Sequence, residues 1–152
     1  MKTRILVFLL MSMILFGAAA AADTLTLTFV GDASIGDAIS SRGHQNSFHS
    51  VVLEKGMDWP FSLVKDTLLE DDLTVANLEG SITTRRKHKD ILYPLVIAPE
   101  FTEILKVGGI DVVNTANNHA LDFFDEGYQD TLEHLEAAGI GHFGTLSPPG
   151  RT

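Results

Sequence analysis

The chain contains no cysteine and few basic side chains. The missing thiols exclude disulfides, thiolate metal sites, cysteine nucleophiles and lipid-modified cysteine from all 152 residues. Any metal ion must therefore bind to aspartate, glutamate, asparagine and histidine. Lysine and arginine number 11 against 20 acidic residues, giving a formal charge of −9. This balance predicts no nucleic-acid partner, because phosphate backbones are bound through basic patches. A phosphorylated substrate stays open, since bound metal ions invert the local field.

The first 22 residues have the order of an export signal. Lys2 and Arg4 precede an apolar run, and alanines up to Ala22 supply the small residues that signal peptidase reads. We expect cleavage after Ala22, which leaves a signal peptide at 1–22 and one domain at 23–152. The mature protein would then be periplasmic or extracellular. A membrane anchor is the alternative, because the apolar segment just reaches the length of a spanning helix.

Strands alternate with helices through the rest of the chain. Runs of β-branched and apolar residues predict strands over 24–31, 73–78 and 110–116, and a fourth strand is expected to start at 141–144. Apolar residues at helical spacing predict helices over 61–70, 99–108 and 125–138. A loop with a short helix is expected over 33–46. This alternation predicts an α/β fold with a layered sheet and right-handed crossovers.

Polar residues follow three of the predicted strands. The four with metal-binding or acid–base chemistry are Asp32, Glu79, Asn118 and His119. If the three strands are neighbours, these side chains meet at the carboxyl edge of the sheet, where α/β proteins collect their chemistry. Two carboxylates, an amide oxygen and an imidazole form a hard ligand set suited to Mn²⁺, Fe or Zn²⁺. A carboxylate such as Glu79 would bridge two ions.

Each polar residue also has a purely structural interpretation. A Gly-Asp pair after a strand is most often a turn, and Glu79 before a glycine is a common loop acid. A histidine directly after an apolar strand is harder to dismiss, because it can serve as a ligand or an acid. The basic run at 85–89 is expected to be a solvated loop. The remaining histidines are expected to be structural or solvated, and they are His44, His49, His134 and His142.

Three segments carry a family resemblance. GDASIG (31–36), NLEGSIT (77–83) and the long run from Gly109 to Ile140 resemble successive motifs of CapA-type proteins of poly-γ-glutamate capsule synthesis. The third segment, which includes ANNHALD, is the most specific. The resemblance covers nearly all of the mature chain. It implies the calcineurin-like metallophosphoesterase fold, a sandwich of mixed β-sheet flanked by helices, with a site for two metal ions.

The resemblance also implies roles for individual residues. Asp32 matches the aspartate of the superfamily's first Asp-x-His motif, and Glu79 stands where the bridging carboxylate is found. Asn118 matches the ligand asparagine of Gly-Asn-His. His119 matches the histidine that protonates the leaving group or stabilises the transition state. Asp122 lies three residues further on, where a carboxylate would orient the His119 ring.

The chain departs from the family pattern in two ways. Ser34 occupies the position of the first-motif histidine, which leaves one metal with fewer ligands. The family also continues well beyond this length and supplies further ligand histidines there. We therefore expect the chain to be a truncated, N-terminal part of such a domain.

Two classes of function follow from these features. The first is an exported CapA-like protein with a metallophosphoesterase-type site that handles an anionic envelope polymer or a phosphorylated small substrate. Its expected partner is membrane-associated machinery for capsule synthesis or export. The second is a non-catalytic envelope protein that keeps the fold and binds a polymer or partner. Simple hydrolysis of a phosphodiester or nucleotide in the periplasm is a further alternative.

Overall fold

The structure is a computed structural model that describes residues 24–144. The predicted signal peptide and its cleavage site lie outside the described residues. Within 24–144, no helix combines the length and apolar character needed to cross a membrane.

Four parallel strands form the main sheet. They are ordered β1 (Leu27–Asp32), β3 (Leu73–Asn77), β6 (Val112–Asn114) and β7 (Gly141–Phe143). Every neighbouring pair is connected by a segment that returns along the sheet, as parallel pairing requires. The four predicted strands are thus confirmed, although β6 is shorter than expected. The α/β class with a parallel sheet is confirmed as well.

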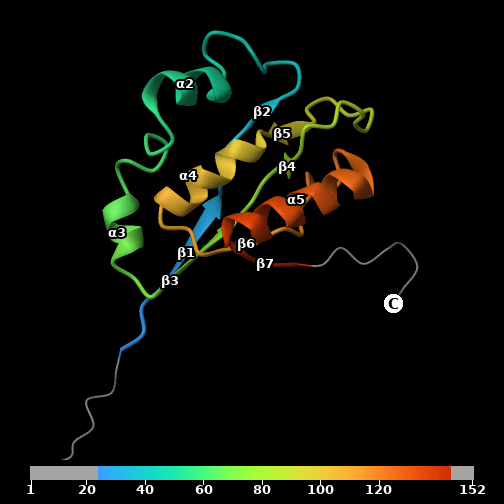
Figure 1. The fold of residues 1–152 in the computed structure, drawn as a ribbon. Helices are drawn as coiled ribbons and strands as arrows, with labels where there is room; N and C mark the ends of the chain where they lie inside the picture. The colour runs from blue at the N-terminus through green and yellow to red at the C-terminus, as the bar shows by residue number, and fades with distance from the viewer. Residues whose placement is uncertain (1–23, 145–152) are drawn as a thin grey trace, which may run out of the picture.

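Two helical segments cover one face of this sheet. The first combines η1 (Pro99–Phe101) with α4 (Thr102–Val107), and the second is α5 (Phe124–Ala138). In Figure 1 both lie in front of the strands. Apolar side chains from the helices and the sheet are fully buried between them, among them Leu105, Val113 and Leu135. Removing such surface from water is the main stabilising term of the fold.

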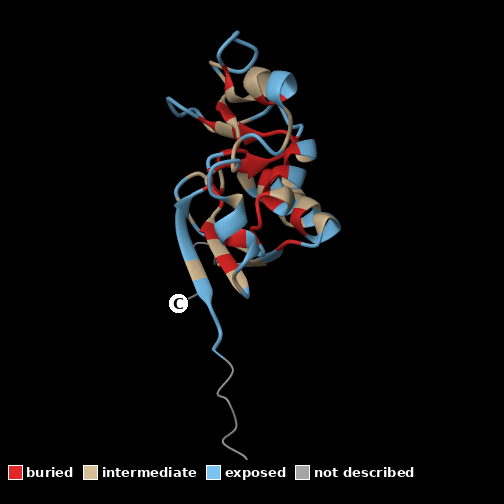
Figure 2. Cartoon of the chain, turned by 90° about the vertical axis from the view of Figure 1, so that its left-hand side faces the viewer, coloured by how far each residue is buried: buried red, intermediate tan, exposed pale blue. Residues whose placement is uncertain are grey.

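The strand β1 lies at the edge of the sheet and is largely exposed. Its Phe29 side chain is 73% exposed, and Leu27 is also accessible. Figure 2 shows the strand as an exposed ribbon at the border of the molecule. The opposite edge is occupied by β7. The helices therefore protect the middle of the sheet and leave its first strand open.

A second, mixed sheet has the order β2 (Asp37–Ala38), β5 (Leu95–Ile97) and β4 (Ser81–Ile82). The β2–β5 pair is antiparallel, and the β4–β5 pair is parallel. None of these short strands was predicted, because two- and three-residue strands carry no readable alternation. They matter here because β4 and β5 lie on either side of the basic loop at 85–89.

The region after β1 differs from the prediction. Residues 33–46 contain β2 and turns but no helix, and α2 (Phe48–Lys55) begins just after them. Ser47 caps this helix, and the buried Asp37 carboxylate accepts the N–H groups of Phe48 and His49. Because Asp37 lies 11 residues before Phe48, local sequence patterns give no sign of this contact. The predicted helix at 61–70 is reduced to α3 (Lys65–Leu69).

Candidate functional site

Three neighbouring strands end on polar residues that bind one another. Asp32, Asn77 and Asn114 occupy paired positions at the ends of β1, β3 and β6. Asn77 Nδ2 donates to Asp32 Oδ1 at 2.7 Å, and Asn114 Nδ2 donates to Asn77 Oδ1 at 2.9 Å. These bonds form a polar ladder across the carboxyl edge of the sheet. Asp32 itself is exposed.

Glu79 lies just beyond the ladder and contacts two other segments. Its Oε2 accepts a hydrogen bond from the Ser34 hydroxyl at 2.8 Å. Its Oε1 lies 3.9 Å from Nε2 of His119. The Glu79 side chain is 23% exposed and that of His119 is 19% exposed. Of the residues expected to meet at this edge, Glu79 and His119 lie side by side, and the contact from the segment after β1 comes from Ser34 and not from the expected Asp32.

The His119 ring is fixed on its other side by Asp122. His119 Nδ1 lies 2.8 Å from Asp122 Oδ2, and the same oxygen accepts the N–H of Leu95 at 2.7 Å. Asp122 is only 1% exposed. A buried carboxylate needs such donors, because burying a charge without them is costly. Asp122 is thus placed where the sequence analysis expected a group that orients the imidazole.

The turn that presents His119 is held by Asn117. Asn117 Oδ1 accepts the backbone N–H of His119 at 3.0 Å. Its Nδ2 donates to Leu78 O at 2.8 Å and to Asn77 Oδ1 at 3.3 Å. Asn117 therefore joins the histidine turn to β3 and to the polar ladder. No organising role could be assigned to Asn77, Asn114 and Asn117 from the sequence, because an amide at the end of a strand is usually just a turn residue.

Asn118 is placed differently from its neighbours. It is exposed, and within residues 24–144 its side chain makes no hydrogen bond. It is therefore near the cluster along the chain without being tied into it. His134 lies on α5, away from these contacts, and is half-buried.

The cluster offers the types of ligand atom that a hard divalent cation binds, but it offers too few of them. Asp32 and Glu79 offer carboxylate oxygens, and Asn118 offers an amide oxygen, the donors that such cations accept. Within the described residues, however, no three histidine, aspartate or glutamate side chains gather closely enough to hold an ion. One oxygen of Glu79 is already bonded to Ser34. The residues present fit part of a metal site and do not complete one.

A largely apolar groove opens beside this cluster. Its volume is about 490 Å³, and its walls include Phe61, Val64 and Leu68 together with Asp32 and Ser34. Asp32 and Ser34 therefore border open space rather than packed protein. A ligand that reaches the cluster from this side would meet polar groups at one end and apolar side chains along the rest.

Comparison with known proteins shows the family. Residues 26–149 match the family described as "Bacterial capsule synthesis protein PGA_cap". This match covers most of the chain, and the protein belongs to that family. The matched range includes both segments that form the candidate site, the one around Glu79 and the one around His119.

Individual relatives agree with this assignment. The chain is 30% identical over 127 residues to "PGA biosynthesis protein CapA" of Bacillus subtilis (strain 168), covering 79% of this chain and 31% of that protein. It is 27% identical over 126 residues to "Capsule biosynthesis protein CapA" of Bacillus anthracis, covering 80% of this chain and 28% of that protein. The chain thus spans about a third or less of the length of these curated relatives.

Proposed function

We propose that this chain contributes part of a metal-dependent site used in making or exporting a poly-γ-glutamate capsule or another anionic envelope polymer. The fold type we assign is that of the calcineurin-like metallophosphoesterases. Family membership supports the capsule context. The observation that carries the chemical part is the arrangement of His119 between Asp122 at 2.8 Å and Glu79 at 3.9 Å.

His119 is arranged to act as a general acid. We assign the proton of this hydrogen bond to Nδ1 of the ring, because a carboxylate oxygen accepts hydrogen bonds. The 3.9 Å separation from Glu79 leaves Nε2 without a short hydrogen bond. In the protonated ring, Nε2–H would donate to the leaving oxygen of a phosphorylated substrate. Asp122 is a positioning residue, since it orients the ring through Nδ1.

A divalent ion would complete this chemistry. Asp32, Glu79 and Asn118 would hold it, with Mn²⁺, Fe or Zn²⁺ as the candidates. When bound, such an ion stabilises negative charge on a phosphoryl oxygen. Because the described residues assemble no group of three His, Asp or Glu ligands, we expect this chain alone to bind metal weakly and to be catalytically inactive.

A second function is favoured by one contact. The Ser34 hydroxyl donates to Glu79 at 2.8 Å, and Ser34 stands where the family resemblance implies a metal-binding histidine. The carboxylate expected to bridge two ions is thereby partly satisfied by the protein itself. This contact favours a non-catalytic protein that keeps the fold and binds a polymer or partner.

We also propose that the protein is exported, on the strength of its basic, apolar and alanine-rich beginning. Its partner would be membrane-associated capsule machinery. Both proposals concern the setting in which the site works and are independent of the metal.

Calorimetric titration with Mn²⁺ and Zn²⁺, combined with a phosphodiester assay on the same samples, tests the metal part. Weak binding that Glu79→Gln abolishes, with no turnover, supports an incomplete metal site. Binding unchanged by Glu79→Gln contradicts the assignment and leaves the polymer-binding function. Tight binding of two ions by the chain would show that the site is already complete.

A further inference from the structure

A second feature lies next to the His119 turn and is used by none of the chemistry above. Residues 85–89 (RRKHK), here called the basic loop, hold four of the 11 lysine and arginine side chains of this acidic chain. The sequence predicts a solvated loop for this run. Three of its side chains, those of Arg85, Lys87 and Lys89, also line a cavity of about 500 Å³.

The basic loop is fixed to the rest of the protein at both ends. At its start, Arg85 binds the Asp130 carboxylate of α5 through two hydrogen bonds, of 2.7 and 2.9 Å. The Arg85 guanidinium holds the pKa of Asp130 below its ordinary value, and a Thr83 hydrogen bond acts in the same direction. At its end, Lys89 N–H donates to Asp122 O at 2.8 Å. Between them, the His88 ring packs against Phe123 with centroids 6.0 Å apart.

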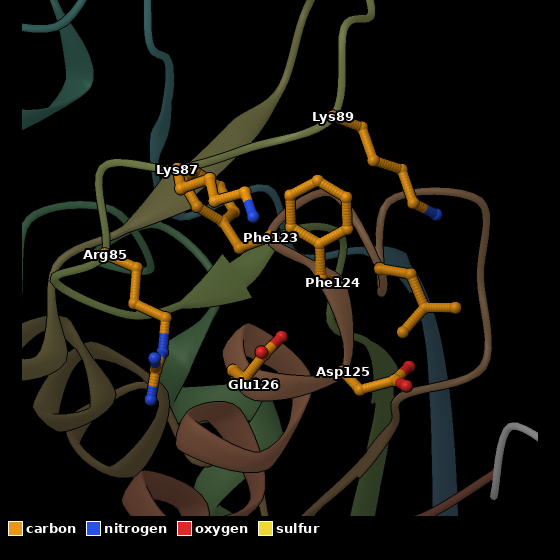
Figure 3. A pocket seen from close by; sticks show the side chains of 8 residues that line it. Arg85, Lys87, Lys89, Phe123, Phe124, Asp125 and Glu126 are labelled. Atoms are coloured by element: carbon orange, nitrogen blue, oxygen red, sulfur yellow. The ribbon is translucent and has the colours of Figure 1, made fainter.

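The cavity between the basic loop and the start of α5 has walls of opposite charge. Lys87 and Lys89 lie on one side, and Asp125 and Glu126 lie on the other. Figure 3 shows the Phe124 ring between these two sides. Within 24–144, neither lysine takes part in an ion pair. Both ammonium groups are thus free to bind an anion.

The backbone at this position is unusual. Phe124 has a φ of 61°, and it is the one residue other than glycine with positive φ among the described residues. A bulky residue in that conformation costs free energy, and such residues concentrate at binding and catalytic sites. The conformation places the Phe124 ring with its centroid 5.3 Å from Lys87 Nζ. The strained residue is thus the one whose ring lies against the Lys87 ammonium group in the cavity.

We propose that this cavity is a subsite for an acidic, amide-linked chain, with Lys87 and Lys89 binding its carboxylates. The Phe124 ring would contact the methylene groups between them. Asp125 and Glu126 would accept its amide N–H groups. A γ-linked glutamate polymer carries all three kinds of group. The identity of the chain rests on the proposed capsule function, whereas the subsite rests on the cavity itself.

The acidic wall is what makes the assignment specific. A polyphosphate or teichoic-type chain presents anions without amide donors, so Asp125 and Glu126 would only repel it. An acidic polyamide has carboxylates for the lysines of one wall and amide N–H groups for the carboxylates of the other. Specificity of this kind needs an unfavourable interaction with the wrong ligand as well as a favourable one with the right ligand.

The subsite also has a direct connection to His119. Leu121 and Phe123 line the cavity and flank Asp122, whose side chain points to the His119 ring. The backbone bond from Lys89 to Asp122 joins the basic loop to that same residue. A polymer bound in the cavity would therefore contact the two sequence neighbours of Asp122, the residue that orients the His119 ring.

The experiment is a binding titration of the full chain with a fluorescently labelled γ-glutamate oligomer, followed by anisotropy in EDTA. We compare wild type with Lys87→Gln/Lys89→Gln and with a charge-matched control, Arg42→Gln/Lys106→Gln, whose residues are exposed and outside the cavity. The lysine pair should weaken binding about fivefold or more, as partly exposed ion pairs allow. The control should change it less than twofold. Equal losses in both variants, or no binding by wild type, would overturn the proposal.

A second variant tests the acidic wall. Asp125→Asn/Glu126→Gln should weaken γ-glutamate binding and strengthen polyphosphate binding, because the acceptors become weaker and the repulsion disappears. Stronger binding of both polymers would overturn amide recognition. Circular dichroism of each variant verifies folding. Since EDTA is present throughout, failure of the proposed metal site leaves this result unchanged, and the two proposals fail separately.

Discussion

Asp122 Oδ2 is shared between Nδ1 of His119 at 2.8 Å and the backbone N–H of Leu95 at 2.7 Å. One buried oxygen thus connects the turn after β6 to the first residue of β5. The same carboxylate therefore both orients the His119 ring and satisfies the backbone N–H at the start of β5.

Replacing Asp122 should therefore affect both stability and the histidine. Asp122→Ala leaves the Leu95 N–H without its partner, and we expect a loss of about 1–3 kcal/mol in unfolding free energy. Urea unfolding measures this, with the exposed Asp90→Asn as control. Nitrogen NMR of His119 should also report a change in tautomer. An unchanged tautomer would mean that Asp122 does not position the proton.

The roles of the site residues can be separated by comparing metal binding with turnover in a longer version of the protein. Glu79→Gln and Asn118→Ala should weaken Mn²⁺ binding by at least the ~10–100-fold that loss of a group supporting a metal ligand costs, because both residues are proposed as ligands. His119→Ala should instead reduce turnover while metal binding stays close to wild type, because a general acid carries no ion. Equal metal loss in all three variants would show that the roles are wrongly assigned.

The Arg85–Asp130 pair predicts a pH dependence. Because the Arg85 hydrogen bond lowers the folded pKa of Asp130 below its ordinary 3.8, the pair stabilises the fold above that value. The contribution is lost as pH falls through the lower, folded pKa. The destabilisation caused by Asp130→Asn should therefore be constant between pH 5 and 7 and shrink at pH 3. Urea titrations at these pH values, with Glu54→Gln as a control, test it. The same destabilisation at pH 3 as at pH 7 would contradict the linkage.

Gly127 should resist substitution although it lies within a helix. Alanine favours helix over glycine by roughly 1 kcal/mol. Its Cβ would, however, clash with Cβ of Phe123, which follows the buried Asp122. We expect Gly127→Ala to be destabilised by about 1–3 kcal/mol in net terms, as overpacking costs. Gly31→Ala, whose Cβ meets nothing within 4 Å, is the control. A thermal melt in which Gly127→Ala is the more stable variant would refute the packing argument.

Export can be tested directly. N-terminal sequencing of the secreted or periplasmic product should begin at Asp23, as cleavage after Ala22 requires. An uncleaved product recovered with membranes would support the anchor instead.

The elements with a regular pattern of apolar or β-branched residues could be predicted from the sequence. The strands β1, β3 and β6 lie in β-branched runs, and α5 carries a helical stripe over several turns, and these patterns determine their type. The strands β2, β4 and β5 were missed, because two or three residues show no period. The helix α2 was missed because Asp37, which caps it from a distance, is not a local signal.

The candidate site divides in a similar way. Residues with distinctive chemistry, such as Glu79, His119 and Asp122, could be singled out from their position after strands. Asn77 and Asn117 could not, because an amide after a strand is usually just a turn residue. Their importance comes from bonds between segments about 40 residues apart, such as Asn117 to Asn77. Only the folded sheet shows those partners.

The Asp32–Asn77–Asn114 ladder bears on how the sheet assembles. Its two bonds join residues 45 and 37 positions apart, and each forms only when two strands are paired in the observed alignment. A strand that slips by one residue turns its terminal side chain to the opposite face and breaks the ladder. The two hydrogen bonds therefore stabilise the sheet only when its strands are paired in the observed register. Parallel strands pair slowly, because segments far apart in the chain must meet before any bond between them forms. The polar edge would therefore be completed late in folding, and only a correctly folded chain would bind a ligand there.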